Sequence, residues 1–164
     1  MEIKANTFRH KLLAWLLAIA MAVGMAPVTA SAAAPHTHDG KSFSPGVGQG
    51  VLRTCNCYLS HDEKVNNTTG IIVSGSAVTV NICLNGHTLD LGGKNIQILH
   101  GATVNIYDCA GGGGKITGGK GATYKDSKKG GAIYVRGSTL NIYGGTIEGN
   151  EAVWGGAIFI DGTE

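Results

Sequence analysis

The sequence carries little charge, and almost none of it is unbalanced. Of its 164 residues, 15% are Asp, Glu, Lys or Arg, and the formal net charge is +2. Three of the 13 basic and one of the 11 acidic residues lie in the first 33 positions, which leaves ten of each sign from Ala34 onward. A nucleic-acid-binding surface needs surplus positive charge to displace counterions, and electrostatic docking on anionic lipid needs it too. The balance argues against both kinds of partner.

Proline and aromatic residues are also scarce, whereas glycine is abundant. The chain has 3 Pro and 6% aromatic residues but 27 Gly, of which 26 follow residue 33. The glycines show no Gly-X-Y period, so a collagen helix is excluded. Hydrophobic residues make up 43% of the chain, which is enough for a packed core and argues against wholesale disorder.

The chain has only one long apolar run, and this run has the features of an export signal. A short basic segment ending at Lys11 precedes 15 mostly apolar residues, Leu12 to Ala26, and an A-x-A cleavage box follows at residues 30–32. This order is typical of a secretory signal peptide, and the run is shorter than the ~20 residues that span a bilayer. We predict that residues 1–33 are a signal peptide rather than a retained anchor. The mature chain is then extracellular or at the cell surface.

The rest of the chain is built from repeats. Three pentapeptides share the pattern Thr-x-Asn-x-(Cys/Tyr): Thr79–Cys83, Thr103–Tyr107 and Thr139–Tyr143. Each alternates polar with apolar side chains, as a strand with one buried face does. We predict three strands with equivalent residues in register.

Two further sets of short segments recur around these pentapeptides in a fixed order. They are Thr88–Asp90, Lys115–Thr117 and Thr146–Glu148, and then Ile71–Val73, Ile96–Ile98, Ile133–Val135 and Ile158–Ile160. The last set repeats every 25 residues, except for one interval that is longer by 12 residues. The extra residues fall at 108–114 and 118–129, where the composition is typical of loops.

Three strands in about 25 residues leave no room for a helix in each repeat. The chain must turn at Gly-rich corners, where glycine supplies positive φ, and stack equivalent strands in parallel. We predict an all-β fold, a three-faced parallel β-helix of about three to four coils over residues 71–164, after an irregular N-terminal cap at 34–70. A β-sandwich, the alternative, does not require residues to recur at a fixed period.

The terminal coils of a solenoid need caps, because each coil buries its faces only against its neighbours. The segment Ile158–Ile160 begins a coil that residues 161–164 do not finish. We therefore expect the coils to be incomplete at the C-terminal end. Either the native chain continues past Glu164, or this edge pairs with another chain in end-to-end self-association.

Several segments resemble a known family of repeats. They are Cys83–Leu89, Asn105–Cys109, Gly144–Asn150 and Gly155–Ile158. They are similar to right-handed parallel β-helix repeats of the pectate-lyase-like superfamily, found in large secreted and cell-surface proteins of gut-type bacteria. The last two also resemble repeats of chlamydial polymorphic outer-membrane proteins. The resemblance covers roughly Cys57 to Glu164 and implies a right-handed solenoid, but no particular activity, since this fold serves lyases, hydrolases, adhesins and passive stalks.

The carboxylates give no catalytic cluster. Polysaccharide lyases of this superfamily hold Ca²⁺ with clustered carboxylates, and glycoside hydrolases need a carboxylate pair. Asp90 and Glu148 occupy equivalent outward positions, but Thr117 stands at that position in the coil between them. We assign no catalytic residue and no cofactor.

The cysteines allow different interpretations. Cys83 and Cys109 lie about one coil apart, and export favours a disulfide between them, although Cys83 aligns with Tyr107 rather than with Cys109. We assign no metal site, because a C-x-C spacing is unusual in structural zinc sites. The alternative left open is a metal site formed by His36, His38, Cys55, Cys57 and His61.

One outward face is unusually regular. Its three columns are Thr79, Thr103 and Thr139; Asn81, Asn105 and Asn141; and Cys83, Tyr107 and Tyr143. Such columns stabilise a sheet through cross-strand contacts. The alternative is a binding surface on which the Thr, Asn and Tyr side chains hold a glycan, since aromatic rings stack on sugars.

These observations predict a secreted or cell-surface structural and adhesion module that contacts glycans or a host surface. One alternative is the N-terminal portion of a polysaccharide lyase or glycoside hydrolase whose catalytic coils lie beyond residue 164. A third hypothesis is an ice-binding surface formed by the regular Thr and Asn columns.

Overall fold

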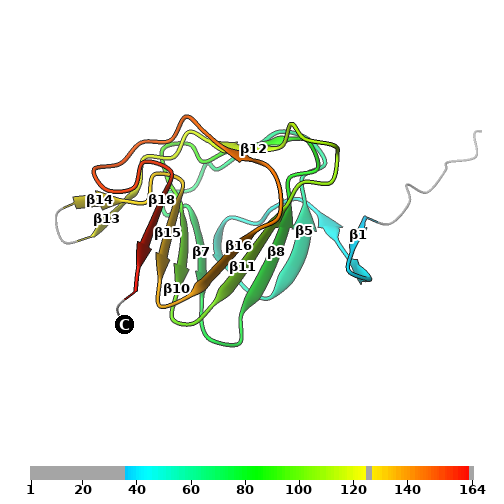
Figure 1. Ribbon diagram of the computed structural model, residues 1–164, viewed down its shortest axis with the longest axis horizontal. Helices are drawn as coiled ribbons and strands as arrows, with labels where there is room; N and C mark the ends of the chain where they lie inside the picture. Colours follow the sequence, from blue (N-terminus) through cyan, green and yellow to red (C-terminus); the bar gives the residue numbers. More distant parts are fainter. Residues whose placement is uncertain (1–35, 125–126, 163–164) are drawn as a thin grey trace, which may run out of the picture. The chain divides into compact units, whose positions relative to one another are not determined.

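The computed structural model describes residues 36–124 and 127–162. These residues form strands and turns but no helix, and most strands belong to three parallel sheets (Figure 1). The predicted signal peptide, residues 1–33, lies outside the described residues. No helix in the described part of the chain is long and apolar enough to cross a membrane.

The first sheet consists of the isoleucine-rich segments. Its order is β4 (Gly50–Leu52), β7 (Ile71–Ser74), β10 (Ile96–Leu99), β15 (Ile133–Arg136) and β18 (Ile158–Asp161). Ile96 pairs with Ile71 on one side and with Ile133 on the other, and Ile133 pairs with Ile158. The predicted register of this set is confirmed.

The second sheet consists of the Thr-x-Asn segments. Its order is β3 (Ser44–Pro45), β5 (Cys55–Tyr58), β8 (Thr79–Cys83), β11 (Thr103–Tyr107) and β16 (Thr139–Ile142). Asn105 pairs with Asn81 and Asn141, and Tyr107 pairs with Cys83. The columns predicted from the pentapeptides therefore exist.

The third sheet is made of the shortest strands. Its order is β6 (Glu63–Lys64), β9 (Thr88–Asp90), β12 (Lys115–Thr117) and β17 (Thr146–Ile147). Along the chain, a strand of the first sheet is followed by one of the second and then one of the third. This cycle is a parallel β-helix of four to five coils, so the predicted fold class is confirmed.

The coils begin earlier than residue 71. The strands β4, β5 and β6 add one strand at the N-terminal end of each sheet, and β3 adds a further strand to the second sheet, so these additions lie within residues 44–64. The sequence carries a signal for this coil, because Thr54–Tyr58 has the full Thr-x-Asn-x-Tyr pattern. Its inward positions hold Cys55 and Cys57 in place of the usual aliphatic residues, which hides the match.

The core is the column of side chains that point inward from all three sheets. Val80, Ile82, Val104 and Ile106 are at most 1% exposed, and burying each contributes roughly 1.5–3 kcal/mol of hydrophobic stabilisation. Sharp corners separate the strands. At Gly92, φ is 57° and an added Cβ would collide with the carbonyl oxygen of Val65 in the preceding coil, so this corner requires glycine.

One antiparallel hairpin interrupts the coils and another precedes them. The strands β13 (Ala122–Tyr124) and β14 (Ser127–Lys129) pair within the predicted loop insertion at 118–129. The strands β1 (Thr37–His38) and β2 (Lys41–Ser42) pair near the N-terminus. Asp39 and Gly40 lie between these two strands, and both have positive φ, as a two-residue Asp-Gly hairpin turn requires.

Candidate functional site

The asparagine column forms a continuous ladder. Asn81 Nδ2 donates to Asn56 Oδ1 at 2.6 Å, Asn105 Nδ2 donates to Asn81 Oδ1 at 2.7 Å, and Asn141 Nδ2 donates to Asn105 Oδ1 at 2.8 Å. At Asn81 and Asn105 both ends of the amide are used within the column, and Asn81 is 5% exposed. The central amides therefore stabilise neighbouring coils, and each uses one of its two N–H donors and one of its two acceptor positions in doing so.

The tyrosines point outward, as their register predicts, and form an aromatic column. The rings of Tyr107 and Tyr143 stack at 4.9 Å, and His38 stacks on Tyr107 at 4.8 Å. Burial raises the pKa of Tyr107, whereas Tyr143 is 65% exposed. The N-terminal hairpin thus covers part of the predicted binding face, and Tyr143 is the ring that a ligand can reach.

The threonine column lies beside the asparagine ladder. Thr79 and Thr103 are half-buried, and Thr139 is exposed. The backbone N–H of Thr79 donates to Thr54 Oγ1 at 3.1 Å. The hydroxyl of Thr54 therefore links successive coils.

Cys83 and Cys109 come together despite their difference in register. Cys109 lies two residues beyond β11, and its Sγ is within hydrogen-bonding distance of Sγ of Cys83, at 3.4 Å, without a disulfide between them. Cys83 is buried, and burial raises the pKa of its thiol to about 11. The predicted disulfide partners are neighbours with free thiols in this structure.

The five residues of the alternative metal site do not lie together in the structure. Cys55 and Cys57 face the core, and His61 hydrogen-bonds Ser60 at the surface. His36 and His38 instead lie beside the other two cysteines: His36 Nε2 is 3.6 Å from Cys109 Sγ and 2.9 Å from His38 Nε2. Spacing along the chain did not indicate this grouping, because His36 and Cys109 are 73 residues apart.

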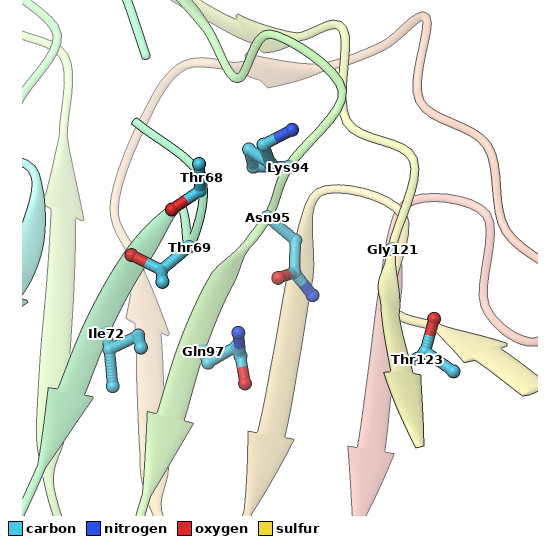
Figure 2. A pocket seen from close by; sticks show the side chains of 8 residues that line it. All are labelled: Thr68, Thr69, Ile72, Lys94, Asn95, Gln97, Gly121 and Thr123. Atoms are coloured by element: carbon cyan, nitrogen blue, oxygen red, sulfur yellow. The ribbon is translucent and has the colours of Figure 1, made fainter. Parts of the chain in front are cut away.

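A polar groove of about 330 Å³ lies on the outer side of the first sheet. Figure 2 shows the residues that line it: Thr68, Thr69, Ile72, Lys94, Asn95, Gln97, Gly121 and Thr123. Ile72 and Gln97 are paired residues of β7 and β10 that point outward. The segment leading into and including β13 supplies Gly121 and Thr123, so the 12-residue insertion creates one wall of the groove.

The groove is held in shape by a buried amide. Asn95 is 2% exposed, and its Nδ2 donates to the carbonyl oxygen of Gly130 at 3.1 Å. This bond fastens the base of the insertion to the preceding coil. Among the described residues, neither the ammonium of Lys94 nor the amide of Gln97 has an ion-pair or hydrogen-bond partner, so both are free to meet a ligand.

The outward carboxylates of the third sheet are paired with lysines. Asp90 lies 3.0 Å from Lys64 Nζ, and Glu148 lies 3.2 Å from Lys115 Nζ. Asp90 and Glu148 are therefore each part of a surface ion pair. Thr117 pairs with Asp90 in the sheet, as the sequence alignment of the coils predicts.

The C-terminal end of the solenoid exposes apolar side chains. Ile142 is 43% exposed and Ile160 is 69% exposed. With Leu140, Ile158 and Val135 they line a hollow on the last coil. This end has the apolar character expected of a face that packs against another element.

Comparison with known proteins adds no assignment. No family model, no curated protein and no solved structure matches the chain. The fold therefore defines the class, a parallel β-helix, and any function must be argued from the sites on its surface.

Proposed function

We propose that this protein is a secreted or cell-surface structural and adhesion module that contacts glycans through the polar groove beside β7, β10 and β13. The groove is the single observation that carries the proposal. The likeness of the repeats to pectate-lyase-like β-helix proteins of the bacterial surface is consistent with it. Ile72 and Gln97 of the groove lie on paired strands of the solenoid, and a preorganised scaffold limits the ordering cost of binding.

The chemistry of the groove suits a sugar. The hydroxyls of Thr68, Thr69 and Thr123 and the amide of Gln97 can each donate and accept hydrogen bonds, as sugar hydroxyls require. Ile72 offers apolar surface for the C–H face of a sugar ring. Small-ligand sites combine apolar surface with a small number of placed polar groups that fix the orientation of the ligand.

Lys94 indicates the class of glycan. Its ammonium is the charged group among the lining residues, and it has no carboxylate partner in the described part of the chain. A sugar carboxylate would supply that partner through a charge-assisted hydrogen bond. We therefore favour a glycan that contains uronic acid over a neutral one.

A glycan array with the exported chain tests this proposal. We expect uronate-containing oligosaccharides to bind, and Lys94→Ala to weaken the binding about tenfold or more, since a hydrogen bond to a charged group contributes roughly 1.5–3 kcal/mol. Arg53→Ala, which removes an exposed cation outside the groove, should leave binding unchanged. No binding, or equal loss in both variants, would refute the proposal.

Incubating the exported chain with the same oligosaccharides in solution distinguishes binding from catalysis. Release of shorter oligosaccharides would support the alternative of a polysaccharide-degrading enzyme instead. Unchanged oligosaccharides that stay bound would support the adhesion module.

A further inference from the structure

We propose that His36, His38, Cys83 and Cys109 form a Zn²⁺ site that fastens the N-terminal β1–β2 hairpin to the solenoid. One ligand atom from each of these residues lies within 4.8 Å of all the others. The inference is independent of the glycan groove, which lies on a different sheet.

Three of the separations are close to those of a tetrahedral zinc site. Zn–N bonds of about 2.0 Å and Zn–S bonds of about 2.3 Å place the ligand atoms roughly 3.3 Å apart for two nitrogens, 3.5 Å for nitrogen and sulfur, and 3.8 Å for two sulfurs. The structure has 2.9 Å between the histidine nitrogens, 3.6 Å between His36 and Cys109, and 3.4 Å between the cysteines. These three separations lie within about 0.4 Å of the tetrahedral values. The other three, which join a histidine nitrogen to a cysteine sulfur, are at most 4.8 Å, so closing the set around an ion requires them to shorten by up to about 1.3 Å.

The fold positions each pair of ligands separately. The Asp39–Gly40 turn folds β1 back on β2, and His36 and His38, two residues apart, point to one side of the hairpin. Their rings are oriented by stacking, His36 on Tyr58 at 4.4 Å and His38 on Tyr107 at 4.8 Å. Such outer contacts fix the orientation of metal-binding rings.

The cysteine pair comes from neighbouring coils. Cys83 ends β8, and Cys109 follows β11, the strand that pairs with β8. The sheet therefore holds the two sulfurs together whether or not the hairpin is docked. The ligands then come from two rigid segments, and the metal would join them.

The chemistry of the set favours zinc over harder cations. Two nitrogens and two sulfurs in a tetrahedron suit Zn²⁺, whereas Ca²⁺ and Mg²⁺ require oxygen ligands. Both thiols release their protons on binding, and the two thiolates balance the charge of the ion. A neutral centre of this kind is compatible with the buried side chain of Cys83.

A disulfide between Cys83 and Cys109 is the competing state. A disulfide needs an S–S distance of about 2.05 Å, against the 3.4 Å in this structure, and it would remove both thiolate ligands. Metal binding and disulfide formation therefore exclude each other, and the experiment must distinguish them.

Metal analysis of the exported chain provides the test. After equilibration with ZnCl₂ and dialysis we expect one zinc per chain, and Co²⁺ in its place should give the visible bands of a tetrahedral ion with thiolate charge transfer. Cys109→Ser, at an exposed position, should weaken zinc binding by more than about tenfold. His38→Gln should do the same. Loss of a residue that only orients a ligand already costs roughly 10- to 100-fold in metal affinity.

Matched controls keep the result specific. His61→Gln and Cys55→Ser remove a histidine and a cysteine outside the cluster, and both should retain one zinc per chain. Zinc should raise the melting temperature of the wild-type chain but not that of Cys109→Ser. Absence of zinc, zinc retained by Cys109→Ser, or a Cys83–Cys109 disulfide in the exported chain by mass spectrometry would overturn the proposal.

Discussion

At the scale of the residue, Asn105 shows how a repeated side chain stabilises the solenoid. Its amide donates to Asn81 and accepts from Asn141. Asn105→Ala removes both bonds, and because each contributes roughly 0.5–1.5 kcal/mol, we expect the free energy of unfolding to fall by about 1–3 kcal/mol in urea denaturation. Asn66→Ala, at an exposed position outside the ladder, should change it little. Equal stability of the two variants would contradict the structural role of the column.

Asp90 links stability to pH. The N–H of Gly92 donates to its carboxylate at 2.8 Å, and Lys64 pairs with it, so the pKa of Asp90 is lowered from its ordinary value of 3.8. A lowered pKa in the folded state means that the carboxylate contributes stability above about pH 3.8, and that this contribution is lost as the pH falls through the folded pKa.

Asp90→Asn removes this dependence. We expect the variant to be less stable than the wild type at pH 7, with the difference narrowing as the pH drops below 3.8. Denaturant unfolding at a series of pH values measures it. Glu151→Gln, at an exposed carboxylate, is the control, and a gap that widens toward acid would contradict the assignment.

At the scale of the element, the corners between strands differ in how well they tolerate replacement of glycine by a larger residue. Gly92 and Gly93 are adjacent and both have positive φ, but an added Cβ collides with Val65 at Gly92 and meets nothing within 4 Å at Gly93. Gly93→Ala should cost about 1–2 kcal/mol, the penalty for a left-handed L-residue. Gly92→Ala should cost more, because the neighbouring coil must also move. Thermal melts of the pair measure this difference, and equal melting temperatures would show that the coils separate easily at this corner.

The strands of the solenoid could be predicted because their information is local and repeated. Asn81, Asn105 and Asn141 mark the same position in three coils, and a period of two fixes which face each neighbour occupies. The strand at Cys55–Tyr58 belongs to the same series, but its inward cysteines do not look like core residues. Cys is among the residues most often buried, so inward cysteines are compatible with a core strand.

The hairpin over the second sheet could not be predicted in the same way. Asp39 and Gly40 indicate a turn, but nothing periodic relates His36 and His38 to Cys83 and Cys109. Their proximity depends on where a non-repeating segment packs, and that is decided by stacking on Tyr58 and Tyr107. Likewise the groove depends on how the insertion at 118–129 folds back, which its polar composition does not reveal.

At the scale of the whole molecule, the two ends of the solenoid differ in character. The N-terminal coil buries Phe43 and Val47, whereas the C-terminal coil exposes Ile142 and Ile160. β18 and β16 are the outermost strands of their sheets, and such edges invite pairing with a further strand. A second copy of the chain that presents the same apolar end would cover both surfaces at once, as a two-fold symmetric dimer does.

We therefore predict end-to-end dimers through the C-terminal coil. Light scattering over a range of concentrations should show a reversible shift from monomer to dimer, and Ile160→Lys should abolish it because a buried lysine without a partner is costly. Val51→Lys, which alters the 70% exposed valine of β4 at the opposite edge of the first sheet, should leave the dimer intact. A wild-type chain that stays monomeric at all concentrations would contradict the dimer. Loss of association in Val51→Lys as well would indicate head-to-tail stacking of coils, because only that arrangement brings β4 of one chain to β18 of the next.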